Sequence, residues 1–594
     1  MSRRTALLIA MLAGCASAQQ PLAVGSKPPA LRKLVVVGVN DTHGALLSAP
    51  APKWLQRHTD APVGGADWFA GWLEAIRAEA RDTGGAVVLL DGGDMFQGTL
   101  ISNQFKGRSV VEVYEAVGLA AAAIGNHEFD FGQAALIERI KEARFPILGA
   151  NVFYKGTRQR PEWARPTVMI EAGGVKVGII GLLTAETATV TNPAFVTDLE
   201  FVDGGPIAAP LADELRAAGA TVVLITAHAG PLPGGAADRE VQRIAQACAG
   251  KVDAIVSGHT HISVGCCRDG EERCRCGTGP ITVAGIPVVQ SGAKLTQISL
   301  IEIDLDDAGR ARGFRVNDGT FPHPGGPQPL FQRFRGKAPR WRGHEVRPVE
   351  RVAAIVAKYD AGVKSLRDTR IGATKVPLIK GGDDALLANL AVDALRSGAG
   401  GGLKASFAFQ NQGGLRISEI PAGPITYGQI FDLSPFDNQQ VVVTLKAHEV
   451  RNALEAVIKA GKGALRVSGL NYTVDWSRHR PERKLSSEPP GSLVTLMTDE
   501  AGAPLCRTES CTETACTASC AQGDFTVALT DFLANGGDGL AMLKEARRQV
   551  GPVLARDILV EFVKANNPLT PDLLGAGRRR VVQTGREERE SRAE

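Results

Sequence analysis

Five short polar clusters in the first half of the chain hold residue types that could do metal chemistry. They are Asp41-Thr42-His43, Asp91-Gly92-Gly93-Asp94, Gly125-Asn126-His127-Glu128, His228, and Gly258-His259-Thr260-His261. Carboxylate, imidazole and amide groups are hard or borderline ligands that suit divalent metal ions. A site for two metals also needs a group that bridges ions about 3.5–4 Å apart, and a carboxylate of the second cluster is the natural candidate. Spacing alone does not decide between Asp91 and Asp94.

Each cluster follows a short apolar run, at the point where that run ends. The runs occupy residues 33–40, 86–90, 121–124, 221–225 and 252–256. They are continuous rather than alternating, and most are rich in Val and Ile, which is typical of strands buried on both faces. Helical patterns such as 66–81 and 132–143 lie between them. Because α/β sheets place their sites at the carboxyl ends of strands, we predict an α/β fold with the site at that edge.

The order of the clusters resembles the calcineurin-like metallophosphoesterases, whose signature runs D-x-H, G-D, G-N-H-[ED], H and G-H-x-H. Gly93-Asp94 aligns with the G-D element, so the resemblance makes Asp94 the bridging ligand and leaves Asp91 a supporting or structural role. Mixed nitrogen and oxygen ligands suit Mn, Zn, Fe or Co, and the sequence does not choose among these ions. The resemblance implies one metal held by Asp41, His43, Asp94 and His261, and a second held by Asp94, Asn126, His228 and His259.

Two further residues take catalytic roles by the same resemblance. His127 stands beside the scissile phosphate, stabilises charge in the transition state and protonates the leaving oxygen, and Asp130 orients it. The chemistry fits, because a histidine can act as an acid at neutral pH and a carboxylate fixes its tautomer. The 5′-nucleotidase branch of this superfamily often has glutamine or asparagine at the position of His261. A histidine there matches the wider superfamily and should still bind metal.

The second half of the chain resembles the 5′-nucleotidase C-terminal domain over the stretches 411–416, 434–438, 467–470 and 532–539. In that family two aromatic rings sandwich the nucleobase, and the matching positions are Phe436 and Phe532. Stacking on a ring face grips any base without reading its identity, and it is worth ~1–3 kcal/mol per contact. The alternative for each ring is a place in the hydrophobic core. Flanking Pro, Gly, Asn and Asp put both rings beside loops, which favours a site.

Three polar residues complete the implied substrate site. The resemblance places Asn411 at the base and Asp538 at the ribose hydroxyls. It places Arg416 at the substrate phosphate, where a planar charged fork is apt. Some relatives carry another arginine ahead of the helix expected at 383–396, whereas only Lys380 is basic in the stretch 380–383. Weaker phosphate binding or a different preferred substrate would follow.

The first 20 residues predict an export signal. Arg3 and Arg4 precede an apolar run over 6–13 that is too short to span a membrane. Residues 12–15, Leu-Ala-Gly-Cys, resemble the bacterial lipobox, which makes Cys15 the lipidated first residue. The alternative is an ordinary signal cleaved near residues 16–18. Residues 16 and 17 lack the aspartate that retains such lipoproteins in the inner membrane, so we expect a periplasmic or cell-surface lipoprotein, with the outer membrane favoured.

Eight of the other cysteines fall into two local groups. They are Cys266, Cys267, Cys274 and Cys276 in one segment, and Cys506, Cys511, Cys516 and Cys520 in another. In an exported chain such groups indicate disulfides on surface loops, and each group allows three pairings. A structural zinc is the alternative, but neither segment has the paired C-x-x-C spacing.

Length, charge and composition bound the remaining possibilities. The chain has 594 residues, 44% hydrophobic and 22% charged, which is an ordinary globular balance. Its net charge of +4 is too small for a dedicated nucleic-acid binder, so we expect no nucleic acid polymer as a partner. The sequence leaves the oligomeric state open.

Composition shifts and the two resemblances divide the chain. The catalytic domain should be a four-layer α/β sandwich of mixed sheets with flanking helices, and the second a smaller α/β nucleotide-binding domain. The helical pattern at 350–366 is where we place a hinge between them. We predict a signal peptide over 1–20, a tether over 21–32, the catalytic domain over 33–345, a linker helix over 346–370, the substrate-binding domain over 371–575 and a charged tail over 576–594.

These features together predict a phosphohydrolase that converts nucleoside 5′-phosphates to nucleoside and phosphate, by attack of a metal-activated water on phosphorus. The alternatives on the same scaffold are a 2′,3′-cyclic nucleotide phosphodiesterase, a nucleotide-sugar or nucleoside di- or triphosphate hydrolase, and the related sulfate-ester hydrolase of sulfur oxidation. The base clamp favours nucleotides over sulfur chemistry. A non-catalytic surface lipoprotein that binds nucleosides is a further alternative, and the intact set of ligands with His127 and Asp130 argues against it.

Overall fold

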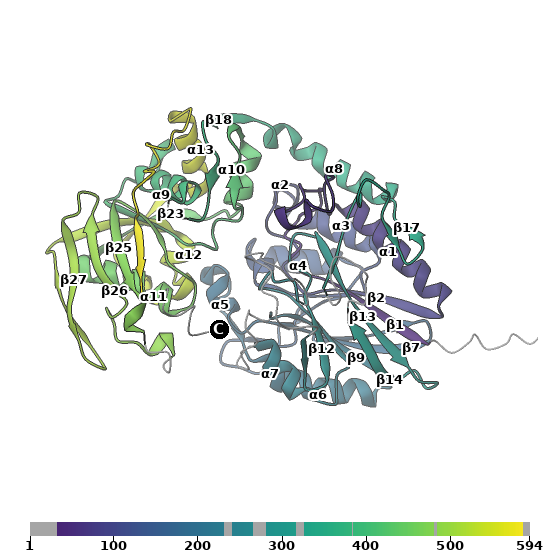
Figure 1. Ribbon diagram of the computed structural model, residues 1–594. Helices are drawn as coiled ribbons and strands as arrows, with labels where there is room; N and C mark the ends of the chain where they lie inside the picture. The colour runs from purple at the N-terminus through teal and green to yellow at the C-terminus, as the bar shows by residue number, and fades with distance from the viewer. Residues whose placement is uncertain are drawn as a thin grey trace, which may run out of the picture.

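The computed structural model describes residues 32–230, 240–264, 281–316, 326–382, 384–479 and 484–585. The predicted export signal with Cys15, the tether up to residue 31 and the first cysteine group lie outside these residues. Figure 1 shows an N-terminal half and a C-terminal half with helix α8 passing between them.

Two mixed sheets form the centre of the N-terminal half. The first has the order β14-β13-β1-β2-β3-β4, in which β1 to β4 are parallel and β15 pairs with β13. Its strands are β1 (Lys33–Val39), β2 (Gly85–Asp91), β3 (Ala121–Ala123), β4 (Ile147–Leu148), β13 (Gln297–Leu305), β14 (Ala311–Val316) and β15 (Gln328–Pro329).

The second sheet has the order β11-β12-β10-β9-β7-β6, with β7, β9, β10 and β12 parallel. Its strands are β6 (Thr167–Ala172), β7 (Val175–Leu183), β9 (Val222–His228), β10 (Ala254–Ser257), β11 (Ile281–Val283) and β12 (Ile286–Val289). Two small ribbons stand apart from both sheets, β5 (Val152–Tyr154) with β8 (Leu199–Phe201), and β16 (Arg340–Trp341) with β17 (His344–Glu345).

Strand β1 explains why these strands are continuous apolar runs. Leu34 and Val36 pack between the two sheets, against residues such as Val177 and Val256. Val35, Val37 and Val39 face the other way, into the core under the helices. Helices α1 (Ala66–Asp82), α3 (Arg108–Val117) and α4 (Gln133–Glu142) cover the first sheet, and α6 (Gly204–Ala217) and α7 (Glu240–Ala247) cover the second. The predicted four-layer sandwich is confirmed.

Helix α8 (Glu350–Arg367) joins the halves and matches the helical pattern at 350–366. Its buried residues Val352, Val356, Tyr359 and Val363 belong to the same core as α1 and α3. Glu112 of α3 also accepts a 2.7 Å hydrogen bond from Tyr359. The helix is therefore packed as part of the N-terminal half.

The C-terminal half is a smaller α/β unit built on two five-stranded sheets. The first runs β24-β20-β29-β23-β30, with strands β24 (Arg466–Ser468), β20 (Phe407–Gln410), β29 (Asp524–Thr530), β23 (Gln439–Lys446) and β30 (Arg548–Leu554). The second runs β28-β27-β26-β25-β31, with strands β28 (Cys516–Cys520), β27 (Pro504–Cys511), β26 (Val494–Asp499), β25 (Leu470–Asp475) and β31 (Val581–Thr584).

Helix α11 (Ala447–Lys459) packs in the core between these sheets, and α9 (Leu386–Ser397) and α13 (Ala555–Ala565) cover the outer face of the first. Helix α10 (Tyr427–Leu433) contributes Phe431 to the N-terminal core. Two more two-stranded pairs, β18 (Arg370–Thr374) with β22 (Gly423–Thr426) and β19 (Leu378–Ile379) with β21 (Glu419–Ile420), lie near the start of this half.

The predicted charged tail over 576–594 contains strand β31. The prediction of a tail was therefore wrong for residues up to 585. Val581 and Val582 pair in parallel with β25, and Arg580 binds Asp393 through two hydrogen bonds of 2.5 and 2.8 Å. Most of the stretch 576–594 is polar or charged, so its few apolar residues did not predict a strand.

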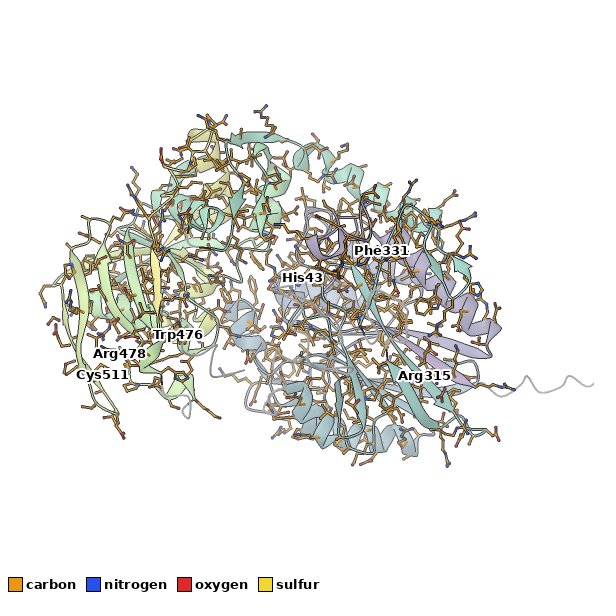
Figure 2. The ribbon with its side chains drawn as sticks, in the orientation of Figure 1. His43, Arg315, Phe331, Trp476, Arg478 and Cys511 are labelled. Atoms are coloured by element: carbon orange, nitrogen blue, oxygen red, sulfur yellow. A yellow bond between two sulfur atoms is a disulfide. The ribbon has the colours of Figure 1, made fainter. Side chains whose placement is uncertain are left out.

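The second cysteine group forms the disulfides Cys506–Cys520 and Cys511–Cys516, which join β27 to β28. The predicted disulfides are confirmed for this group. Figure 2 shows Cys511 on the outer sheet of the C-terminal half, far from His43. In the described part of the chain, no helix combines the length and apolar character that a membrane crossing needs.

Candidate metal centre and substrate cavity

The five polar clusters meet at the carboxyl ends of strands from both sheets. Asp41 and His43 follow β1, Asp94 follows β2, and Asn126 follows β3 on a short turn, η2 (Asn126–Phe129). His228 is the last residue of β9, and His259 and His261 follow β10. Their ligand atoms form two groups, Asp41 with His43 and His261, and Asp94 with His228 and His259.

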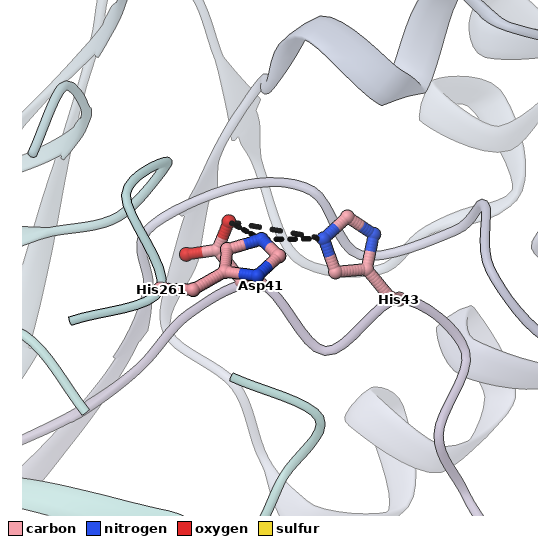
Figure 3. A group of neighbouring side chains, drawn as sticks. All are labelled: Asp41, His43 and His261. Carbon is pink, nitrogen blue, oxygen red and sulfur yellow. Dashed lines mark hydrogen bonds and ion pairs between the residues drawn. The ribbon is translucent and has the colours of Figure 1, made fainter. Parts of the chain in front are cut away.

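The first group holds two imidazoles and a carboxylate in contact (Figure 3). The Nε2 atom of His261 lies 3.2 Å from Asp41 Oδ1 and 2.9 Å from His43 Nε2. The other nitrogen of His43, Nδ1, lies 2.8 Å from the Gln97 carbonyl oxygen. A carbonyl only accepts, so Nδ1 carries the hydrogen and Nε2 presents a lone pair to its neighbours. This is the state that binds metal.

The second group repeats this arrangement. His228 Nδ1 lies 2.8 Å from the Gly92 carbonyl oxygen, so Nδ1 carries a hydrogen and Nε2 faces the group. That Nε2 lies 3.1 Å from Asp94 Oδ2, 3.1 Å from Asn126 Oδ1 and 3.2 Å from His259 Nδ1. Asn126 donates its amide to the Val190 carbonyl, so its oxygen faces inward. Ligand atoms that converge in this way suit a divalent cation between them.

Asp94 connects the two groups. Its Oδ2 lies 3.1 Å from His228 Nε2 and 3.9 Å from His43 Nε2, so one carboxylate reaches ligands of both. Asp91, the rival candidate, belongs to neither group. Its carboxylate accepts from the Gly93 N–H at 2.7 Å and from the Tyr114 hydroxyl at 2.5 Å. The structure therefore gives Asp91 the supporting position and Asp94 the position between the two groups.

Burial favours the neutral forms of His43 and His259, whereas burial of His228 is outweighed by Asp94 and Asp41, which raise its pKa to about 10. Burial lowers the pKa of His43 well below 6.5, and the Arg416 charge lowers it further. Burial and the neighbouring His228 lower the pKa of His259 to about 3. Burial alone would raise the pKa of Asp94, but His228 and His127 hold it well below its usual value. A metal ion bound here would displace the proton of His228, because a coordinating histidine is neutral.

The backbone at the site is strained. Asp41, His43, Asp94, His259 and His261 all have positive φ, between 48° and 80°. Such conformations cost roughly 1–3 kcal/mol each for residues with a Cβ, and they persist only where the surroundings impose them. Gly125 is one such surrounding, because a Cβ there would lie 2.2 Å from Asp94 Oδ1.

Glu128 holds the Asp94 loop, and the sequence analysis gave it no role. It is fully buried, and its two carboxylate oxygens accept hydrogen bonds from the backbone N–H groups of Asp94, Met95, Phe96 and Gly125 at 2.6–3.1 Å. The acidic residue at the end of G-N-H-[ED] was the available signal. Its function is to fix two of the ligand-bearing loops together.

His127 and Asp130 form a pair at the edge of the metal groups. His127 Nδ1 donates to Asp130 Oδ2 at 2.6 Å, and Nε2 lies 4.0 Å from Asp94 Oδ2. Burial of the ring lowers the pKa of His127, but Asp130 and Asp94 outweigh it, so the pKa lies above 6.5. The Asp130 contact therefore fixes the ring, with Nε2 on the side of Asp94.

A cavity of about 250 Å³ opens beside this pair and is lined by both halves. All five predicted substrate residues line it: Asn411, Arg416, Phe436, Phe532 and Asp538. Arg416 Nη2 donates to His43 Nε2 at 2.9 Å, so its guanidinium reaches the metal groups. Phe436 stands 5.6 Å from the His127 ring, between centroids. Asn411 donates to Asp538 Oδ2 at 2.7 Å.

Several residues that line the cavity were not predicted. Gln97, Phe131, Val190, Thr191, Asn192, Phe195 and Lys462 are among them. Lys462 lies in the loop between α11 and β24, where a lysine among glycines gives no motif signal. Lys380, the residue noted in place of a relative's arginine, donates to the Leu415 carbonyl at 2.5 Å and so supports the Arg416 loop.

Comparison with known proteins matches both halves. Residues 34–263 match the calcineurin-like phosphoesterase family, and residues 370–545 match the 5′-nucleotidase C-terminal domain. The snake venom 5′-nucleotidase of Naja atra is 28% identical over 91% of this chain and 98% of its own. The solved 5′-nucleotidase precursor of Thermus thermophilus is 25% identical, with a TM-score of 0.71 over 93% of this chain and 99% of its own.

A second solved structure shares the fold alone. The sulfate thiohydrolase SoxB of Thermus thermophilus is 17% identical, with a TM-score of 0.66 over 94% of this chain and 98% of its own.

Proposed function

Because the chain belongs to the family that joins a calcineurin-like phosphoesterase domain to a 5′-nucleotidase C-terminal domain, we propose that it is a metal-dependent 5′-nucleotidase. It converts nucleoside 5′-phosphates to nucleoside and phosphate. The observation that carries the proposal is the shared cavity. One wall holds the metal groups and His127, and the other holds Phe436, Phe532 and Asp538. A nucleoside monophosphate has both ends that this cavity addresses.

Two divalent ions are the cofactors, and when bound they neutralise phosphoryl oxygens and lower the pKa of water. Asp41, His43 and His261 would hold one ion, Asn126, His228 and His259 the other, with Asp94 shared. Arg416 approaches the same place from the C-terminal half. Its guanidinium adds the positive charge that a transferring phosphoryl group needs.

His127 supplies the proton for the leaving oxygen. Its Nδ1–H is fixed on Asp130, so Nε2 is the atom that carries the mobile proton toward the nucleoside oxygen. The raised pKa keeps that proton available near neutral pH. Nucleoside alkoxides are poor leaving groups, so this transfer is a large part of the reaction barrier.

The C-terminal wall binds the nucleoside. Phe436 and Phe532 offer ring faces to the base, and Asn411 stands beside them. The Asp538 carboxylate accepts from Asn411 on one oxygen and keeps acceptor capacity for ribose hydroxyls. These contacts grip any base, so we expect activity on purine and pyrimidine nucleotides alike.

The test is phosphate release by the purified full-length protein with added Mn²⁺ or Zn²⁺. The panel holds AMP, UMP, ATP, UDP-glucose, 2′,3′-cyclic AMP and bis-p-nitrophenyl phosphate. A coupled phosphatase releases phosphate from the monoesters that the diesters and UDP-glucose would yield, and Asp94→Asn is the control. We expect release from AMP and UMP that requires metal and is lost in the control. Activity confined to diesters or nucleotide sugars would mean that these are the substrates in place of nucleoside 5′-phosphates. No activity with metal bound would favour a sulfate-ester hydrolase or a nucleoside-binding protein.

We also propose that the chain is exported and held by lipid on Cys15. The signal-like residues 1–20 and the disulfides Cys506–Cys520 and Cys511–Cys516 support export, since disulfides persist in oxidising compartments. Labelled palmitate should enter the wild-type protein and not Cys15→Ser, and the variant should leave the outer-membrane fraction. Equal labelling of both would contradict the anchor.

A further inference from the structure

One short segment touches both the catalytic pair and the base-binding wall. It runs from Thr184 to Phe195 after β7 and includes α5 (Thr187–Val190) and a turn, η3 (Pro193–Phe195). Its start is held by Glu240, which accepts from the Thr184 hydroxyl at 2.6 Å and the Ala185 N–H at 2.8 Å. We call residues 184–195 the α5 segment.

The segment contacts the catalytic pair through Thr191. Its hydroxyl donates to Asp130 Oδ1 at 3.0 Å, while Asp130 Oδ2 accepts from His127. Each oxygen of the carboxylate therefore has one donor, and the two donors together fix the plane of the carboxylate. Thr191 is only 1% exposed, so its hydroxyl is held by packing as well as by this hydrogen bond.

The next residue contacts the C-terminal half. Asn192 donates its amide to Asp531 Oδ2 at 2.9 Å, and Asp531 directly precedes the base-binding Phe532. The Asn192 oxygen accepts from the Ala194 N–H at 3.1 Å, which fixes which way the amide points. A second tie is the 2.8 Å ion pair between Glu186 of the segment and Lys462 of the cavity wall.

Two consecutive residues thus join the base-binding wall to the general acid. We propose that Thr191 and Asn192 are positioning residues that couple seating of Phe532 to orientation of His127, a proposal that rests on the proposed 5′-nucleotidase function. The relay runs from Asp531 through Asn192 and Thr191 to Asp130. Through these contacts, proton donation by His127 is most effective when Asp531 and Phe532 are in place against Asn192. The relay therefore favours nucleotides over phosphate esters that lack a base.

The first test uses the leaving group. Thr191→Val keeps the shape and removes the hydroxyl, Thr191→Ser keeps the hydroxyl, and Thr189→Val is the matched control, because the exposed Thr189 hydroxyl donates to the Glu186 carbonyl within its own turn. AMP needs a proton on its leaving oxygen, whereas p-nitrophenolate leaves readily without one. We expect Thr191→Val to lower the ratio of kcat on AMP to kcat on p-nitrophenyl phosphate by about 10-fold, with Thr191→Ser restoring it.

The second test exchanges the partners of the docking contact. Asn192→Asp faces Asp531 with a like charge and should lower kcat on AMP more than kcat on p-nitrophenyl phosphate. In the double variant with Asp531→Asn, residue 531 donates and residue 192 accepts, so the hydrogen bond is restored in the opposite direction. We expect its kcat on AMP to return to within about twofold of the wild-type value. Thermal unfolding of each variant verifies that the fold is kept.

The outcomes separate the two ideas. A wild-type protein that does not hydrolyse AMP would overturn the proposed function and the relay with it. An active wild type whose AMP to p-nitrophenyl phosphate ratio is unchanged by Thr191→Val would overturn the relay alone. A double variant no better than Asn192→Asp would also overturn the coupling through Asp531.

Discussion

At the scale of single residues, hydrogen-bond direction determines what the site can hold. The Nδ1 atoms of His43 and His228 are each committed to a backbone carbonyl, Gln97 and Gly92 respectively. Both rings therefore turn Nε2 toward the neighbouring carboxylates and imidazoles, where it is the atom available to a metal ion. Ligand type was predictable from sequence. Ring orientation was not, because which backbone carbonyl each Nδ1 meets depends on how loops from different strands pack together.

Glu128 gives the sharpest prediction at this scale. Its two oxygens accept four backbone N–H groups, so Glu128→Gln would turn an NH₂ toward two of these donors. We expect the free energy of unfolding to fall by about 1–3 kcal/mol, because buried donors lose their acceptor. Urea unfolding monitored by circular dichroism measures this change. The exposed Glu138→Gln is the control, and equal stability of the two variants would contradict the role assigned to Glu128.

At the scale of elements, strand ends were predictable and the contacts between distant loops were not. Continuous Val and Ile runs followed by polar clusters predicted β1, β2, β9 and β10 with their ligands at one edge. The tie between Asn192 and Asp531 spans 339 positions in the chain, and neither residue lies in a recognisable motif. A strand can be predicted from the local pattern of apolar residues. A hydrogen bond between distant loops depends on how the two halves pack, which the local pattern does not contain.

The turn beneath Phe532 gives a prediction for an element. In η7 (Gly537–Gly539), a Cβ on Gly537 would lie 2.5 Å from the Phe532 ring. Gly537→Ala should displace the ring and weaken base stacking of ~1–3 kcal/mol, so KM for AMP should rise about 10-fold. The KM for p-nitrophenyl phosphate should change far less. Gly313→Ala in β14, where a Cβ meets open space, is the control, and a parallel rise in both KM values would count against Phe532 as a base contact.

At the scale of the whole molecule, the metal groups join the two sheets of one half. Asp41 and Asp94 follow strands of the first sheet, and His228 and His259 belong to the second. The core of this half also includes α8 and Phe431 of α10, whereas the buried residues of the two C-terminal cores are separate from it and the half-buried Tyr427 packs against one of them as well. Stability gained from metal should therefore appear in the N-terminal half.

Removing the metals tests this division. Any ligand that binds only the folded state stabilises it by RT ln(1 + [L]/Kd), which is about 4 kcal/mol at 1,000 times Kd. In calorimetry, a chelator should lower the Tm of the transition that belongs to the N-terminal half and leave the C-terminal transition nearly unchanged. Asp94→Asn loses the carboxylate shared by both groups, so its N-terminal transition should respond weakly to added Mn²⁺. A single transition that shifts as a whole would mean that the halves unfold as one unit, and equal shifts of two transitions would contradict the division.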